Sequence, residues 1–289
     1  MDICRILKNI KTCEYYTPKN ANITIVTVVR DQNLIFVEFI LGFSHTHHIK
    51  WLLPDITPTN KYIRFPITMV IRVFCKKHYC VDTVLWNHAC VLYQIGLLKK
   101  TTLLKNCIIG SEICDQVLGN IAPIISSTQD IIIDYDPDDS CTALLTKEEI
   151  KALWNIHMQY EFVEKDAEKL STVLANNTTH IDIATQTGGD TKKSVTGYYK
   201  YDFLPCLPDG NTTQTLHLII GNNTLIEVLN WTFIHSIPMN HMLPGIRPTY
   251  KPISILVIAI AKFNGCGKMT SENVYWDQYS VLQQAGLIN

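Results

Sequence analysis

Several features that mark whole classes of protein are missing from the sequence. It has no uninterrupted apolar run long enough for a membrane-spanning helix, which needs about 20 residues. The most apolar stretch, 253–263, has the length of a single strand. The N-terminus combines a short apolar segment with no small-residue cleavage site, so we predict no signal peptide and no membrane association. We therefore expect a cytoplasmic protein.

Charge is also scarce. Only 18% of the residues are Asp, Glu, Lys or Arg, the net charge is −1, and no basic stripe is present. Proteins that bind nucleic acid concentrate Lys and Arg on one face, so we expect no nucleic-acid partner. With 47% hydrophobic residues, the 289-residue chain can instead bury a large core, enough for one large domain or two of ordinary size.

The ten cysteines are scattered and form no CxxC units. In a chain of this size with no predicted signal peptide, we expect free thiols rather than disulfides. Asn-X-Ser/Thr sequons would matter only in a secretory lumen, and we attribute them to an Asn- and Thr-rich composition. The sequons begin at Asn22, Asn176, Asn177, Asn211, Asn222 and Asn230.

One pattern occurs twice, always 190 residues apart. The stretch "VLWNHACVLYQIGLL" (84–98) matches "VYWDQYSVLQQAGLI" (274–288), and 43–61 matches 233–251 at the same offset. So long a period indicates two domain-sized copies rather than a solenoid of short repeats. One position changes its chemistry: Asn87 in the early copy is Asp277 in the late one.

The shared unit is predicted to be a strand with a histidine, a proline-containing loop, two further strands and a short closing helix. The late copy alone has a helical front end, which begins at a capping box formed by Thr146 and Glu149. A further short helix is predicted at 190–203 and a hairpin at 215–236.

We therefore predict three regions. Residues 1–105 form a strand-rich copy without its helices, 106–145 a connecting helix and an acidic linker (134–140), and 146–289 a complete copy. An all-strand half unit would leave one sheet face bare. That face should pack on the second copy, on the helix at 106–124 or on another subunit, as in a homodimer through sheet faces.

Residues 146–289 resemble the SnoaL-like polyketide cyclases. The strongest carriers are "HMLPGIRPTYK" (241–251) and "ENVYWDQYSVLQQAGL" (272–287), and 22–98 looks like the second half of another copy. The resemblance implies an α+β fold, the cone of nuclear transport factor 2 and ketosteroid isomerase, with three helices on a curved antiparallel sheet. The first of the tandem copies would lack its helices. It also implies a deep apolar pocket for a small, apolar, carbonyl-containing ligand, with no cofactor.

By this resemblance, Asp277 is a general base that removes a proton from carbon next to a carbonyl, in a cyclase or isomerase reaction. His235 is its candidate partner, orienting the aspartate or stabilising an enolate oxygen. Two-residue alternation puts Trp231 and Phe233 on the strand face of His235, and Tyr275 on the face of Asp277. The predicted substrate-binding set is Trp231, Phe233, Tyr275, Met242 and His241.

Structural readings of the same residues stay open. Asp277 stands where a strand meets a helix, and an N-cap carboxylate is a routine structural feature that Asn87 could equally supply. His235, which repeats His45, could tie its strand to the proline loop. The chain could then be a non-catalytic ligand-binding or assembly module of the same fold. A hydrolase would need an activated Ser or Cys, and no GxSxG motif is present.

A metal site is not expected either. The cluster "HTHH" (45–48) places two histidines on one strand face, which is a pattern that zinc could use. No Cys or carboxylate partner is evident nearby, and the late copy keeps only His235. We therefore predict no metal, and the proposed chemistry needs no nucleotide.

Overall fold

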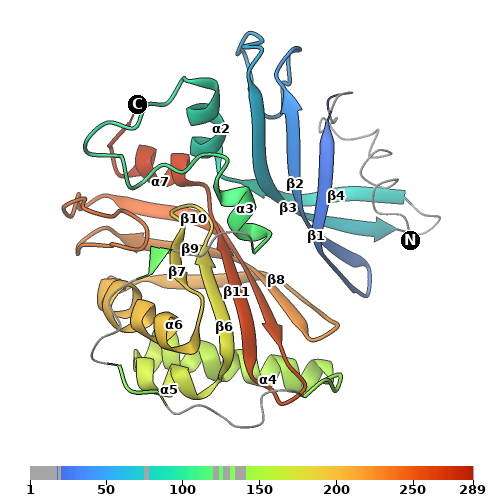
Figure 1. The fold of residues 1–289 in the computed structure, drawn as a ribbon, viewed down its shortest axis with the longest axis vertical. Helices are drawn as coiled ribbons and strands as arrows, with labels where there is room; N and C mark the ends of the chain where they lie inside the picture. Colours follow the sequence, from blue (N-terminus) through green and yellow to red (C-terminus); the bar gives the residue numbers. More distant parts are fainter. Residues whose placement is uncertain are drawn as a thin grey trace.

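The computed structural model describes residue 18 and residues 21–74, 78–119, 124–125, 131–133 and 141–288. These residues form two β-sheets that pack against each other, with helices on the outer side of the second sheet (Figure 1). The acidic linker expected at 134–140 lies outside the described residues. The region boundaries expected near 105 and 145 stay predictions.

The first sheet contains four antiparallel strands in sequence order. They are β1 (Asn22–Asp31), β2 (Leu34–Ser44), β3 (Tyr62–Phe74) and β4 (His78–Trp86). Two short helices follow, α2 (His88–Ile95) and α3 (Ile113–Val117). The connecting helix expected over 106–124 is thus limited, in the described residues, to the single turn and a half of α3.

The second sheet has seven described strands in the order β5-β7-β6-β11-β10-β9-β8. Strand β6 runs parallel to β11, whereas β8 to β11 are antiparallel to one another. The strands are β5 (Ile124–Ile125), β6 (Leu174–Asp182), β7 (Thr187–Gly189), β8 (Thr212–Gly221), β9 (Thr224–Ile234), β10 (Pro252–Phe263) and β11 (Met269–Tyr275).

Helical segments cover one face of this second sheet (Figure 1). They include two π-helices, η2 and η3, each of which directly continues an α-helix. In order they are α4 (Lys147–Met158), η2 (Gln159–Glu164), α5 (Ala167–Thr172), α6 (Lys192–Tyr198), η3 (Tyr199–Phe203) and η4 (Leu204–Cys206). The closing helix α7 (Gln278–Gln284) lies apart from them, beside α2 (Figure 1).

The two copies have the same elements at the same offset. Strands β1 to β4 and helix α2 recur 190 residues later as β8 to β11 and α7, and in the described part of the chain no helix precedes β1. The α+β prediction of tandem copies, the first without its helices, is therefore confirmed. The repeated glutamines make the same contacts in both copies. The side chain of Gln94 accepts the backbone N–H of Arg64 and donates to its carbonyl, and Gln284 does the same with Ser254.

The repeated histidines also play identical structural parts. His45 Nδ1 accepts the backbone N–H of Thr59 at 3.3 Å, and His235 Nδ1 accepts that of Thr249 at 3.2 Å. Each histidine also hydrogen-bonds its backbone to the end of the proline loop. The alternative that His235 ties its strand to this loop is therefore confirmed, because both copies build the same connection.

The helical front end is divided into short segments. The capping box of Thr146 and Glu149 starts α4 as predicted. The chain then leaves the helix at Lys165, whose φ of 52° is left-handed, and Asp166 caps the next helix. Residues 174–182, which follow α5, form β6. The predicted helix at 190–203 and the hairpin around Gly221–Asn223 are both present.

The bare face of the first sheet packs on the second sheet, which confirms one of the three expected coverings. Side chains from both sheets share one hydrophobic core, among them Phe36, Ile40, Val70, Ile226, Val228, Ile258 and Ile260. At its centre the fully buried Glu38 accepts a hydrogen bond from the Tyr275 hydroxyl at 2.6 Å and one from Asn273 at 3.3 Å. The homodimer through sheet faces stays a prediction.

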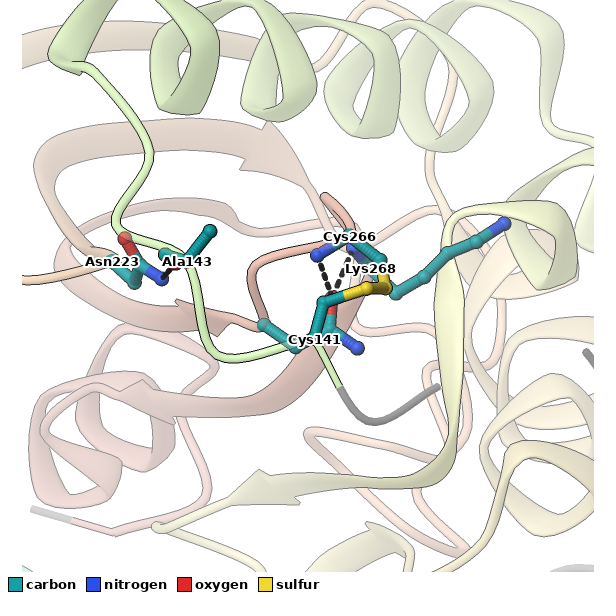
Figure 2. The surroundings of a disulfide bond; sticks show 6 residues. Cys141, Ala143, Asn223, Cys266 and Lys268 are labelled. Carbon is teal, nitrogen blue, oxygen red and sulfur yellow. Dashed lines mark hydrogen bonds between the residues drawn. A yellow bond between two sulfur atoms is a disulfide. The ribbon is translucent and has the colours of Figure 1, made fainter. Parts of the chain in front are cut away.

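A disulfide corrects part of the cysteine prediction (Figure 2). Cys141 and Cys266 are bonded across 125 residues, and the N–H of Gly265 donates to the Cys141 carbonyl at 2.9 Å. Asn223, in the β8–β9 turn, donates to Ala143 at 2.8 Å. The segment before α4 is thereby fastened to two hairpin turns. The expectation of free thiols holds for Cys80, Cys90, Cys107, Cys114 and Cys206.

None of the helices formed by the described residues has both the length and the apolar character that a membrane span requires.

Candidate functional site

A cavity lies between the helices and the face of the second sheet that they cover, opposite the face that packs on the first sheet. It holds about 550 Å³ of empty space, counting its open mouth. Most of its wall is apolar, with five aromatic rings, but carboxylates and histidines gather on one part. The lining residues are Trp154, Met158, Glu161, Phe162, His180, Asp182, Phe203, Thr213, Leu229, Trp231, His241, Val257, Ala259, Glu272, Val274 and Trp276.

Strand alternation decides which side chains reach this cavity. In β6, His180 and Asp182 line the cavity while Ile181, between them, joins the core shared with the first sheet. In the neighbouring β11, Glu272 lines the cavity in the same way, and its backbone pairs with that of His180. Three ionisable side chains are thereby brought together.

His180 links the two carboxylates. Its Nδ1 lies 3.1 Å from Glu272 Oε2, and its Nε2 lies 3.3 Å from Asp182 Oδ1. The hydroxyl of Tyr199 donates to Glu272 at 2.8 Å, and that of Tyr198 donates to Asp182. Every one of these residues is buried, so the group forms a closed polar network rather than a solvated patch.

The network separates the pKa values of its members. Burial opposes a charge on His180, but its hydrogen bonds to Asp182 and Glu272 raise its pKa to about 10. Burial likewise opposes a charge on Glu272, but the nearby His157 and the hydrogen bond from His180 lower its pKa to about 2. At neutral pH the network therefore contains an imidazolium held next to an ionised carboxylate.

The pKa of Glu161 shifts in the opposite direction to that of Glu272, because burial is the largest influence on it. It lies in the π-helix η2, and its Oε2 is 3.0 Å from His157 Nε2. Burial raises the pKa of Glu161, although the hydrogen bond with His157 acts against the shift. The ring of His157 stacks on Trp154, with 5.1 Å between ring centroids. π-Helical turns are rare in proteins overall, and those that do occur are often found at functional sites.

Of the residues predicted from the sequence, Trp231 and His241 line this cavity. Phe233 and Met242 are buried in the same core without being part of the lining. Tyr275 points to the opposite face, where its hydroxyl donates to Glu38 of the first copy. Strand alternation explains the difference, because the neighbours of Tyr275, Val274 and Trp276, are the residues that line the cavity.

Asp277 lies at the junction between the two copies. Its Oδ1 accepts the backbone N–H of Tyr279 and that of His88, and its Oδ2 accepts that of Ser280. It therefore caps α7 and also the start of α2, so the capping role is confirmed (Figure 1 shows the two helices side by side). Burial raises the pKa of Asp277, although these three N–H groups act against the shift.

Neither predicted catalytic residue is in the cavity lining. His235 is bonded to the proline loop through Thr249, and burial lowers its pKa. That Asp277 or His235 acts on a ligand stays a prediction.

Sequence reasoning missed the residues that carry the charge of the cavity. The alternation His180, Ile181, Asp182, Ile183 is a two-residue polar pattern that marks a half-buried strand, and it could have been found. Trp154, His157 and Glu161 recur at helical spacing and could also have been grouped. The pairing of β6 with β11 could not have been found from the sequence, because the two strands are about 90 residues apart.

Across the described ranges, no three His, Cys, Asp or Glu side chains are arranged to hold a metal ion. Two histidines of "HTHH" form hydrogen bonds with different residues: His45 with Thr59, and His47 with Thr46. The polar cluster of the cavity is held together by histidine–carboxylate hydrogen bonds instead.

Comparison with known proteins gives structural likenesses only. No protein-family model matches the chain, and no curated protein matches it. TsrD from Streptomyces laurentii is 14% identical, with a TM-score of 0.41, over 50% of this chain and 99% of that one. A protein described as a SnoaL-like polyketide cyclase from Shewanella putrefaciens is 13% identical, with a TM-score of 0.41, over 50% and 88%. A protein of ketosteroid isomerase-like fold from Catenulispora acidiphila is 16% identical, with a TM-score of 0.36, over 50% and 96%.

Proposed function

We propose that the complete copy binds a small, largely apolar carbonyl compound in this cavity and moves a proton on it, as a cyclase or isomerase does. The observation that carries the proposal is a carboxyl group, Glu161, on the wall of a mostly apolar cavity, with its pKa raised by burial. A carboxylate of raised pKa is a stronger base, and a general base works best when its pKa is near the working pH.

Glu161 is a better candidate than the other acids of this region. Glu272 accepts hydrogen bonds from His180 and Tyr199, and its pKa is about 2, so it is a weak base. Asp182 accepts from two hydroxyls and faces His180. The oxygens of Asp277 are occupied by backbone N–H groups. Among the residues that the structure describes, Glu161 has one side-chain partner, His157.

The proposed reaction transfers a proton between Glu161 and the ligand. The carboxylate of Glu161 takes a proton from carbon next to the ligand's carbonyl, and the C–H electron pair passes into the enolate. Return of the proton from Glu161 to another carbon gives an isomerisation. Attack of the enolate carbon on a second carbonyl closes a ring instead, and the alkoxide oxygen formed then takes the proton back from Glu161. His180, which lines the cavity and has a raised pKa, would stabilise the negative charge of the enolate.

The test is exchange of ligand protons with solvent deuterium. Wild-type protein is expected to accelerate exchange of the α-hydrogens in a panel of small cyclic and aromatic ketones, followed by proton NMR in heavy water. Glu161→Gln removes the base while keeping the shape of the side chain, so we expect the acceleration to fall by about 100-fold or more. Circular dichroism checks that the variant is folded.

Asp277→Asn is the matched control, because it makes the same acid-to-amide change outside the cavity lining. It is expected to leave exchange unchanged. An unchanged rate in Glu161→Gln would contradict the proposed base, and a lost rate in Asp277→Asn would return that role to Asp277.

A non-catalytic binding module of the same fold is the second candidate. It is favoured by the closed network around His180, in which both ring nitrogens already have protein partners. Such a protein would bind the ketones of the panel, measured by quenching of tryptophan fluorescence from the cavity wall, without accelerating their exchange.

A further inference from the structure

His241 leaves one hydrogen-bonding atom of the cavity wall unused. The residue lies in the loop between β9 and β10 and is only 1% exposed. Its ring is 4.8 Å from that of Phe203 and 6.3 Å from that of Trp231, between centroids, and all three residues line the cavity. The backbone of His241 is also held in place, because the hydroxyl of Thr185 donates to the His241 carbonyl at 2.6 Å.

The position of the proton on His241 follows from its neighbours. Nδ1 lies 3.3 Å from the backbone carbonyl of Asp202, and a carbonyl only accepts, so Nδ1 carries a hydrogen. Burial lowers the pKa of His241 to about 4, which leaves the ring neutral with that single hydrogen. Nε2 therefore presents a lone pair and can only accept.

No described residue hydrogen-bonds to Nε2 of His241. In His180, by contrast, both ring nitrogens have partners. Buried polar groups in folded proteins nearly always have a partner, and an unpaired one disfavours the folded state. An unpaired acceptor on a residue that lines the cavity is a site at which a ligand donor would be bound.

We propose that His241 Nε2 accepts a hydrogen bond from a hydroxyl group of the ligand, so that the carbonyl compound bound also carries a hydroxyl on a largely apolar ring. This inference rests on the cavity being the ligand site proposed above. The rings of Phe203 and Trp231 flank the acceptor, which suits a flat ring that carries the hydroxyl.

Charge excludes the commonest competing ligands. A carboxylate or phosphate would meet the lone pair of Nε2, which cannot donate a hydrogen bond to it. An apolar ligand with only acceptor atoms would leave Nε2 unpaired. A neutral donor satisfies the atom without adding charge, and His241 thereby selects hydroxylated ligands over their methyl ethers.

The test uses a matched pair of probes, 2-naphthol and 2-methoxynaphthalene, which differ by the donor hydrogen and one methyl group. Binding is measured by calorimetry and by tryptophan fluorescence. Wild-type protein is expected to bind 2-naphthol about tenfold more tightly than the ether. His241→Phe keeps the ring without the acceptor, so it should lose this preference and still bind the ether.

His241→Gln is the second variant, because its amide oxygen can reach a similar position, and it should keep part of the preference. Equal binding of the two probes by wild-type protein would overturn the role of His241 and leave the cavity proposal standing. Binding of neither probe would overturn the cavity as a site for such ligands and this inference with it. A preference for 2-naphthol that persists in a folded His241→Phe would place the acceptor elsewhere.

Discussion

The same repeat position carries an acid in both copies, and the two acids are used differently. Asp82 in β4 pairs with Arg72 at 2.8 Å and with His217 at 2.6 Å, and its side chain is 23% exposed. Glu272 in β11 is 4% exposed and is bonded to His180 and Tyr199. One position thus serves a partly solvated ion pair in the first copy and a buried network in the second.

The neighbouring strand makes this difference. Strand β4 is the last strand of its sheet, so an acid on it can reach solvent. Strand β11 has a further neighbour, β6, which brings His180 beside Glu272, and helices cover that face. The comparison teaches that the front end of the second copy, residues 147–206, supplies the partners that turn the repeated acid into part of a buried network.

The largest expected effect is loss of the buried partner. His180→Leu leaves two buried carboxylates without their cation, and breaking a buried ion pair in this way costs about 3–5 kcal/mol of unfolding free energy. Asp82→Asn, at the repeat position equivalent to Glu272, breaks a partly solvated pair and should cost at most about 1 kcal/mol. Urea unfolding measures both. Equal costs would contradict the contrast between the two copies.

The same residue predicts a pH dependence. The pKa of His180 is raised to about 10 in the folded protein, so its stabilisation is complete below its ordinary value of 6.5 and is lost as pH rises through about 10. The urea midpoint of wild-type protein should therefore fall between pH 6 and pH 9 by more than that of His180→Leu. Parallel curves for the two proteins would show that His180 is not charged in the folded state.

Much of the fold was predictable, because it depends on local patterns and on internal comparison. The 190-residue offset identified the tandem copies, and the capping box at Thr146 and the turn at Gly221–Asn223 gave correct local structure. Strand β6 was missed because Thr172 and Leu174 continue a helix-like sequence, while its strand character depends on pairing with β11. Tertiary contacts there override the local preference.

The disulfide gives the next largest effect. Replacing Cys141 and Cys266 together by Ser frees the segment before α4 from the β10–β11 turn, and loss of such a cross-link typically costs about 2–4 kcal/mol. Thermal unfolding measures the loss, and hydrogen exchange should locate it in the second copy. Cys80→Ser, at an exposed free thiol of the first copy, is the control and should be nearly neutral. Detection of ten free thiols in the denatured, unreduced protein would contradict this bond.

The candidate site was less predictable than the fold. Trp231 and His241 do line the cavity; His241 lies in the family-like stretch 241–251, and Trp231 was placed by strand alternation with His235. That they bind a ligand stays a prediction. Glu161 and His180 lie in the front end, which has no counterpart in the first copy, so the internal comparison could not point to them. Asp277 was singled out as a candidate because the first copy has Asn87 at the equivalent position. The hydrogen-bond partners of the two residues account for that difference.

The smallest expected effect concerns this difference, and it explains why the acid occurs once. Asp277 is surrounded by three N–H donors, which suit a carboxylate that only accepts. Asn87 accepts from Cys90 and also donates to the carbonyl of Ala184, which requires an amide. Asp277→Ala should cost about 0.5–2 kcal/mol, as for the loss of an N-cap, and Asp277→Asn less.

The reciprocal change makes the argument testable in both directions. Asn87→Asp keeps the cap of α2 but turns a donor into an acceptor facing the Ala184 carbonyl, so it should destabilise more than Asp277→Asn does. Urea midpoints of the two single variants and of the double exchange decide the order. If Asp277→Asn proved the more harmful of the two, the carboxylate would be needed for more than capping, and its raised pKa would become relevant to catalysis.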